Sequence, residues 1–165
     1  MKTSPKTVHL TTPLEPAKLK DLCVGDIVYL SGEIYTARDA AHKRIVEAND
    51  KTLAGKVIYY AGPCPAKPNE PIGSVGPTTA YRMDGFTKKA TEQGLVYSIG
   101  KGDRAPEAVT LIQKAHGIHF DAIGGAGAYY KNCVKKSECI MYGDLGAEAV
   151  YRLTVVDFPV VVRYK

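Results

Sequence analysis

The stretch LVYSIGKGDRAPEAVTLIQKAHGIHFDAI, residues 95–123, does most to decide the fold. Its apolar run over 95–99 is rich in β-branched and aromatic residues, which is typical of a strand. A Gly-Lys-Gly loop follows, and the segment 106–115 then reads as a helix that starts with a proline. A second apolar run, 118–123, predicts another strand. The order strand, helix, strand indicates an α/β fold.

Similar alternation extends to both sides of this stretch. Because the strand-like segments are most frequent near the two ends, a layered β/β/α domain fits better than a doubly wound sheet. We expect a single domain over 14–165, preceded by an N-terminal arm over 1–13 that is rich in Thr, Pro and Lys. The other expected elements are two short strands within 19–35, a helix over 37–48, a strand over 56–60, a helix over 79–92, a helix over 126–135, a strand over 139–142 and paired strands over 149–156 and 158–162.

The composition is that of an ordinary globular domain. Hydrophobic residues make up 45% of the 165 and charged residues 24%, and the net charge of +5 is carried by scattered lysines. Because no basic run is interleaved with aromatic residues, we expect no nucleic-acid binding. No apolar run approaches the ~18 residues that cross a bilayer, and no export signal is evident, so we expect no membrane contact and a cytoplasmic location.

The cysteines are dispersed rather than grouped. Cys23, Cys64, Cys133 and Cys139 are too far apart to match zinc-site spacings, and without an export signal they are expected to be reduced thiols. We therefore expect no metal ligands in this chain, and any metal chemistry would need ligands from another polypeptide.

The strongest candidate for a site is GPTTAYRMD, residues 76–84. Pro77 disfavours helix before it and threonine is a good N-cap, so a helix is predicted to begin at Thr78 or Thr79. Arg82 would then share a helix face with Thr78. Free backbone N–H groups, the helix dipole and a guanidinium together suit a carboxylate or a phosphate. The alternative is an ordinary N-cap followed by a solvated arginine.

Two further cations follow predicted strands. Arg38 stands at the junction of a strand and a helix, beside Asp39 and near His42, and would bind an anion there. Helix capping by Asp39 and packing of His42 on the helix face are the more ordinary roles for those two residues. Lys101, in the Gly-Lys-Gly loop, would lie at the carboxyl edge of a sheet. A site joining Arg38, Arg82 and Lys101 would suit a small dicarboxylate.

A series of short motifs runs along the chain in a definite order. They are GD (25–26), LSG (30–32), ARDAAHKR (37–44), YAGP (60–63), GSVGPTTAYRMD (73–84), IGKG (99–102), IGGA (123–126), EC (138–139), LGAEA (145–149) and DFP (157–159). Together they resemble the C-terminal domain or β subunit of class I, iron-sulfur-dependent fumarases and of the related L-tartrate dehydratases.

This resemblance implies a swivelling β/β/α domain that closes over a [4Fe-4S] cluster held by cysteines of a separate α subunit. It also implies reversible hydration of fumarate to L-malate and an α2β2 assembly, with this chain inactive when alone. A threonine hydroxyl is a weak base and would need activation by a neighbouring group. The resemblance assigns substrate binding to Arg38, His42, Thr79, Arg82 and Lys101, and a place near the proton-transfer step to Thr78.

Two other functions remain open at this point. The β subunit of an L-tartrate dehydratase would bind a dicarboxylate of similar carboxylate spacing, although the segments 34–42 and 124–126 look more like those of fumarases. A stand-alone module without an α partner would use the same cations merely to hold a dicarboxylate.

Overall fold

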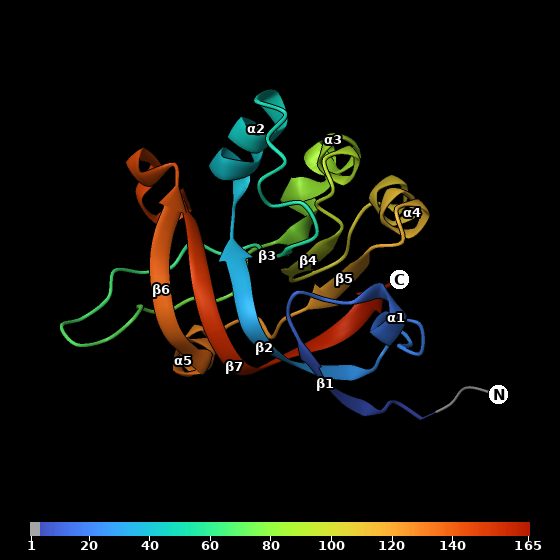
Figure 1. Cartoon of the computed structure of the whole chain (residues 1–165), viewed down its shortest axis with the longest axis horizontal. Helices are drawn as coiled ribbons and strands as arrows, with labels where there is room; N and C mark the ends of the chain where they lie inside the picture. Colours follow the sequence, from blue (N-terminus) through green and yellow to red (C-terminus); the bar gives the residue numbers. More distant parts are fainter. Residues whose placement is uncertain (1–3) are drawn as a thin grey trace.

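A computed structural model describes residues 4–165, and over these residues the chain is a mixed α/β domain with one sheet of seven strands (Figure 1). The α/β class is confirmed, and the layered, swivelling arrangement stays a prediction. No helix in the described part of the chain is long and apolar enough to cross a membrane. The elements are β1 (Thr7–Thr11), α1 (Pro16–Leu19), β2 (Ile27–Thr36), α2 (Asp39–Glu47), β3 (Val57–Tyr59), η1 (Ala80–Phe86), α3 (Thr87–Glu92), β4 (Tyr97–Gly100), α4 (Pro106–Lys114), β5 (Ile118–Asp121), α5 (Gly127–Cys133), β6 (Val134–Met141), η2 (Gly143–Glu148) and β7 (Val150–Tyr164).

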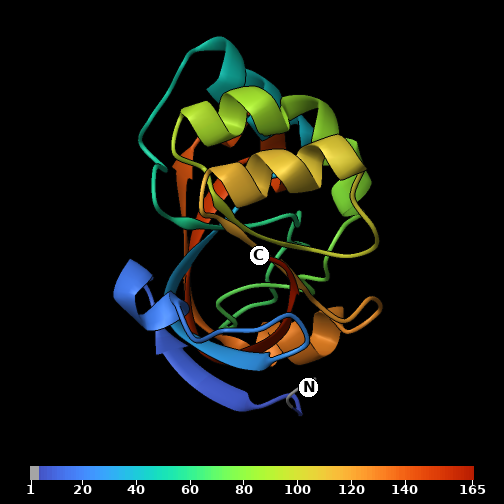
Figure 2. The same cartoon turned by 90° about the vertical axis from the view of Figure 1, so that its right-hand side faces the viewer.

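The sheet is so strongly curved that β7 pairs both with β5 and with β2. Strands β1 to β5 are parallel and adjacent in that order, whereas the long β7 runs antiparallel to β5, β2 and β6. Because β7 pairs with β5 and with β2, the strands β2, β3, β4, β5 and β7 form a closed ring (Figure 2). Helices α2, α3 and α4 lie together on one side of the molecule, next to β3, β4 and β5 (Figures 1 and 2).

Two expected pairs of strands are each a single bent strand. The first pair was expected to be separated at Ser31-Gly32, and the second, over 149–156 and 158–162, at Asp157. In the structure, β2 shifts its register against β7 between Leu30 and Gly32, and Gly32 has a φ of 111°. In β7, Asp157 has a left-handed φ of 50°. A bulge bends a strand without ending its pairing, so these turn-like residues curve the sheet instead of interrupting it.

The arm expected over residues 1–13 is wrong for residues 7–11. These residues form β1, which pairs with β2 from Thr7 opposite Ile27 to Thr11 opposite Ser31. Leu10 is buried in the main core and fixes the segment to it. The sequence did not indicate this strand, because its apolar residues are surrounded by Thr, Pro and Lys. Residues 1–3 of the expected arm lie outside the described residues.

Two apolar cores lie on opposite sides of the strands because alternate residues face opposite ways. In β3, Val57 and Tyr59 belong to the core inside the ring, and Ile58 belongs to the core under the helices. Inside the ring, Phe158 packs between Tyr59 and Tyr130, with ring centroids 5.1 and 4.3 Å from its own.

Replacing Tyr130 by phenylalanine is expected to destabilise the domain by about 1–2 kcal/mol, because its hydroxyl links two segments. The hydroxyl accepts a hydrogen bond from the Ile123 N–H at 2.9 Å and donates one to the Pro159 carbonyl at 2.8 Å. Urea unfolding of Tyr130→Phe measures the loss. The neighbouring Tyr129 is exposed, so Tyr129→Phe is the matched control and should leave stability unchanged. Equal stability of the two variants would contradict the expectation.

Candidate functional site

The ends of the parallel strands β2, β3, β4 and β5 meet at one edge of the sheet, which we call the carboxyl edge. Arg38 follows β2, Gly62 follows β3, Lys101 follows β4 and Gly124 follows β5. A Cβ atom on Gly124 would lie 3.4 Å from Lys101 Cδ, so the lysine stem passes close to the loop after β5. Ligands of α/β proteins usually bind at this kind of edge.

The two threonines of the GPTT motif lie across the ends of β3 and β4. The backbone N–H and the hydroxyl of Thr78 both donate to the Tyr60 carbonyl, at 2.7 and 2.9 Å. Thr79 forms a parallel bridge with Lys101, whose N–H donates to the Thr78 carbonyl at 3.2 Å. The structure therefore places the threonine motif next to the lysine loop at the carboxyl edge.

The helix predicted to begin at Thr78 or Thr79 begins instead at Ala80, as the 3-10 helix η1, and becomes α-helical only at Thr87. Thr79 has extended backbone angles and makes no side-chain cap. Its bridge to Lys101 holds this backbone extended, which delays the helix. Thr78 and Arg82 thus do not share a helix face, and the expected helix N-terminal anion site is not formed there.

Arg82 pairs with Asp39, the residue that follows Arg38 in the sequence and begins α2. Arg82 Nε lies 3.7 Å from Asp39 Oδ2, and the two side chains are 44% and 41% exposed. Arg38 packs against Gly62, where a Cβ atom would come within 3.0 Å of Arg38 Cδ. Arg38 Nε is buried and has no hydrogen-bond partner within residues 4–165. A buried donor without a partner is rare, and an anionic ligand would satisfy it.

His42 is buried on the inner face of α2, in line with the packing role considered for it, and substrate binding by His42 stays a prediction. Its Nδ1 is 2.9 Å from the Arg38 carbonyl and must donate to it, and its ring stands edge-on to Tyr60 at 5.3 Å. Burial lowers the pKa of His42 to about 4, so the imidazole is neutral at pH 7. The hydrogen bond from the neutral His42 ring to the Arg38 carbonyl helps to fix the backbone position of Arg38.

The buried His42 makes stability depend on pH. An unfolded histidine takes up a proton near pH 6.5 and the folded His42 only near 4, so the unfolded state binds more protons between these values. Its contribution to stability is complete above pH 6.5 and is lost as the pH falls towards 4. Between pH 7 and 5 the free energy of unfolding of His42→Gln should fall by about 2 kcal/mol less than that of the wild type. Urea unfolding at both pH values measures this, and an equal fall in both proteins would count against it.

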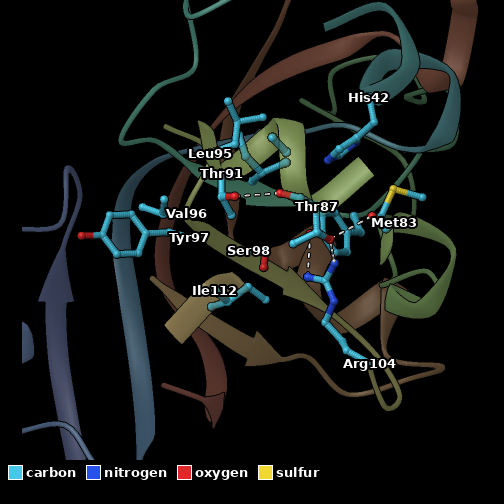
Figure 3. A pocket seen from close by; sticks show the side chains of 13 residues that line it. His42, Met83, Thr87, Thr91, Leu95, Val96, Tyr97, Ser98, Arg104 and Ile112 are labelled. Carbon is cyan, nitrogen blue, oxygen red and sulfur yellow. Dashed lines mark hydrogen bonds between the residues drawn. The ribbon is translucent and has the colours of Figure 1, made fainter. Parts of the chain in front are cut away.

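The interior cavity beneath α2 and α3 is too small for a substrate. It has a volume of about 20 Å³ and is lined by His42, Met83, Ser98 and Arg104, among others (Figure 3). A space of this size holds one water molecule. A dicarboxylate would therefore have to bind outside this cavity.

Sequence reasoning missed Arg104 and Tyr60, both of which line this cavity. Arg104 is 6% exposed and Tyr60 is 5% exposed. Arg104 stands between Gly-Asp and Ala-Pro in a loop, where an arginine is usually solvated. Tyr60 precedes the Ala-Gly-Pro turn, but nothing in its neighbours marks its hydroxyl as a partner of Arg104.

The thiols and carboxylates of the chain do not fit an iron-sulfur cluster. Within residues 4–165 no group of three or more His, Cys, Asp or Glu side chains is placed to hold a metal ion. The cysteines are free, and Cys133 is buried while the other three are exposed. A cluster needs several thiolates close together, and residues 4–165 do not bring such a set together.

Comparison with known proteins gives a consistent result. The family model described as "Fumarase C-terminus" matches residues 1–164. A putative class I fumarate hydratase of Geobacillus stearothermophilus is 32% identical over 163 residues, which cover 95% of this chain and 32% of the relative. The aerobic class I fumarate hydratase of Escherichia coli K12 is 33% identical over 92% of this chain and 30% of its own length. The β subunit of L(+)-tartrate dehydratase from the same organism is 34% identical, over 93% of this chain and 80% of the subunit. The chain thus spans about a third of the fumarate hydratases and most of the tartrate dehydratase subunit.

Proposed function

The chain belongs to the fumarase C-terminus family, and from this premise we propose that it is the β subunit of a class I fumarate hydratase. Its role would be the reversible hydration of fumarate to L-malate, together with a polypeptide that carries a [4Fe-4S] cluster. The named relatives are hydro-lyases, which gives the reaction class.

The observation that carries this proposal is the grouping of cations and hydroxyls on the carboxyl edge. Thr79 and Lys101 are bridged, and Arg82 follows Thr79 by three residues on η1. Arg38, which follows β2, has a buried Nε with no hydrogen-bond partner within residues 4–165. Fumarate and malate carry two carboxylates, so a site with several cations and few apolar groups suits them. We propose that Arg38, Arg82 and Lys101 bind the carboxylates, with Thr79 beside them.

Thr78 is proposed to act near the proton-transfer step. Its hydroxyl proton is directed to the Tyr60 carbonyl, so the oxygen lone pairs are free to accept a hydrogen bond. A carbonyl orients the hydroxyl and does not take its proton. An activating base would therefore come from the partner polypeptide, since Thr78 has no ionisable hydrogen-bond partner within residues 4–165.

The partner is proposed from two facts. This chain has no group of metal ligands in its described part, and it matches most of a protein named as a subunit. We propose a separate α subunit that carries the cluster and supplies the metal chemistry, in an α2β2 assembly. Closure of the two polypeptides would exclude water from the carboxyl edge and strengthen its electrostatic contacts.

The test is anaerobic hydration of fumarate by this chain alone and after mixing with a cluster-bearing α subunit. We expect no activity from the chain alone and activity from the mixture. Turnover of L-tartrate without turnover of fumarate would show that the enzyme is a tartrate dehydratase. This second candidate is favoured because the chain matches 80% of the tartrate dehydratase β subunit. Failure to associate, with dicarboxylate binding retained, would point to a stand-alone binding module.

A further inference from the structure

Arg104 is almost completely buried and uses its whole guanidinium group. Its side chain is 1% exposed. It donates from Nε to Asp84 Oδ1 at 2.8 Å, from one terminal nitrogen to the Tyr60 hydroxyl at 3.0 Å, and from the other to Thr87 Oγ1 at 2.8 Å. Figure 3 shows Arg104 beside Thr87. Asp84 also accepts the Ala105 N–H at 2.7 Å, which fixes the loop that carries Arg104. A buried arginine is tolerated only when it is paired in this way.

Two of these three partners lead directly to the carboxyl edge. Tyr60, which binds Arg104 through its hydroxyl, accepts both hydrogen bonds of Thr78 through its carbonyl. Asp84 lies on η1, two residues after Arg82. The third partner, Thr87, begins α3, and its hydroxyl donates to the Met83 carbonyl on η1 at 3.1 Å, so its connection to the proposed site runs through η1 and not through Thr78.

The contacts of Tyr60 extend this cluster to the remaining arginine. The Tyr60 ring stands against His42, and the His42 ring donates to the carbonyl of Arg38. The guanidinium of Arg104 also lies over the Tyr60 ring, 5.5 Å from its centroid. One buried cation thus connects segments that carry Thr78, Arg82 and Arg38.

We propose that Arg104 is a positioning residue for the dicarboxylate site, acting through Tyr60 on Thr78 and through Asp84 on Arg82. This rests on the proposed function, because it assigns Arg104 a role in the same site. Arg104 lies beneath the carboxyl edge and does not touch substrate. The planar fork fixes its partners relative to one another more tightly than a lysine ammonium would. Small displacements of groups that meet the substrate lower the rate strongly.

Two substitutions that each remove one hydroxyl partner of Arg104 should differ in their effect on kcat. In the assembled enzyme, Tyr60→Phe should lower kcat about tenfold with KM within about twofold, because it loosens Thr78. The matched control Thr87→Val should change neither constant by more than about twofold. Arg104→Lys, which cannot reach all three partners, should lower kcat and raise KM. If Tyr60→Phe and Thr87→Val lose stability alike and keep wild-type kcat, Arg104 has only a structural role and the proposal is overturned.

A second readout needs neither a partner nor activity. In this chain alone, hydrogen exchange of the Thr78 amide should be about tenfold faster in Tyr60→Phe than in Thr87→Val, because that amide is bonded to Tyr60. Equal exchange in the two variants would overturn the positioning role even if the enzyme is active. Faster exchange in an assembly that turns over neither fumarate nor tartrate would support the positioning role and refute the proposed function.

Discussion

The variant Arg82→Ala of the assembled enzyme is expected to lose about 100- to 1,000-fold in kcat/KM, with little change in folding. In the proposed site Arg82 holds a substrate carboxylate through charge-assisted hydrogen bonds, and removing such a donor costs this order of rate. The structure gives it little part in stability. Its ion pair with Asp39 is 3.7 Å long and both side chains are more than two-fifths exposed, and exposed pairs contribute about 0–1 kcal/mol.

The matched control for Arg82→Ala is Arg44→Ala. Arg44 is 41% exposed, close to the exposure of Arg82, and it too forms an ion pair. Its partner is Asp144 on η2, whereas the partner of Arg82 is Asp39 on α2. We expect Arg44→Ala to keep wild-type kcat/KM. Fumarate hydration rates and urea unfolding of both variants make the comparison. Wild-type kcat/KM in Arg82→Ala would remove this residue from the site.

The variant Thr78→Val is expected to lower kcat about 10²- to 10⁴-fold, the range that a group positioned for proton transfer contributes. Valine has nearly the shape of threonine and keeps the backbone N–H bond to Tyr60, so the segment should stay in place. KM should change little, because the cations that bind the carboxylates remain.

The variant Thr78→Ser tests whether kcat depends on the hydroxyl of Thr78 or on the shape of its side chain. Thr78→Ser keeps the hydroxyl that donates to the Tyr60 carbonyl, and we expect it to retain most of kcat. Steady-state rates of both variants, with equal amounts of assembled enzyme, provide the measurement. A Thr78→Val enzyme with wild-type kcat would show that Thr78 has no part in the proton-transfer step.

The α/β class followed from local sequence signals, because strands and helices that alternate along the chain each carry their own pattern. The segment 106–115 is an example: a proline at its start and Gly117 after its end bracket α4, which spans Pro106–Lys114. The family assignment was also accessible, since the resemblance rested on short contiguous runs such as GPTTAYRMD, and the family model matches residues 1–164.

The features that were missed depend on contacts between distant segments. β1 is a strand because β2 lies beside it, and the delayed start of η1 depends on the bridge from Thr79 to Lys101. The burial of Arg104 depends on Asp84, Tyr60 and Thr87, which come from three other segments. Periodicity within a window of residues contains no information about such partners. The assignment of substrate-binding roles to Arg38, Arg82 and Lys101 stays a prediction.

The ring of strands has a consequence for biosynthesis. β7 pairs with β2, β5 and β6, and all three precede it in the chain. The ring therefore stays open until residues 150–164 have left the ribosome. Contacts between such distant segments make folding slow. Until β7 arrives, the strands it will cover have unpaired edges, so the nascent chain is exposed to aggregation. We expect translation pauses or a shortage of chaperones to lower the yield of this protein most when they act before residues 150–164 have been synthesised.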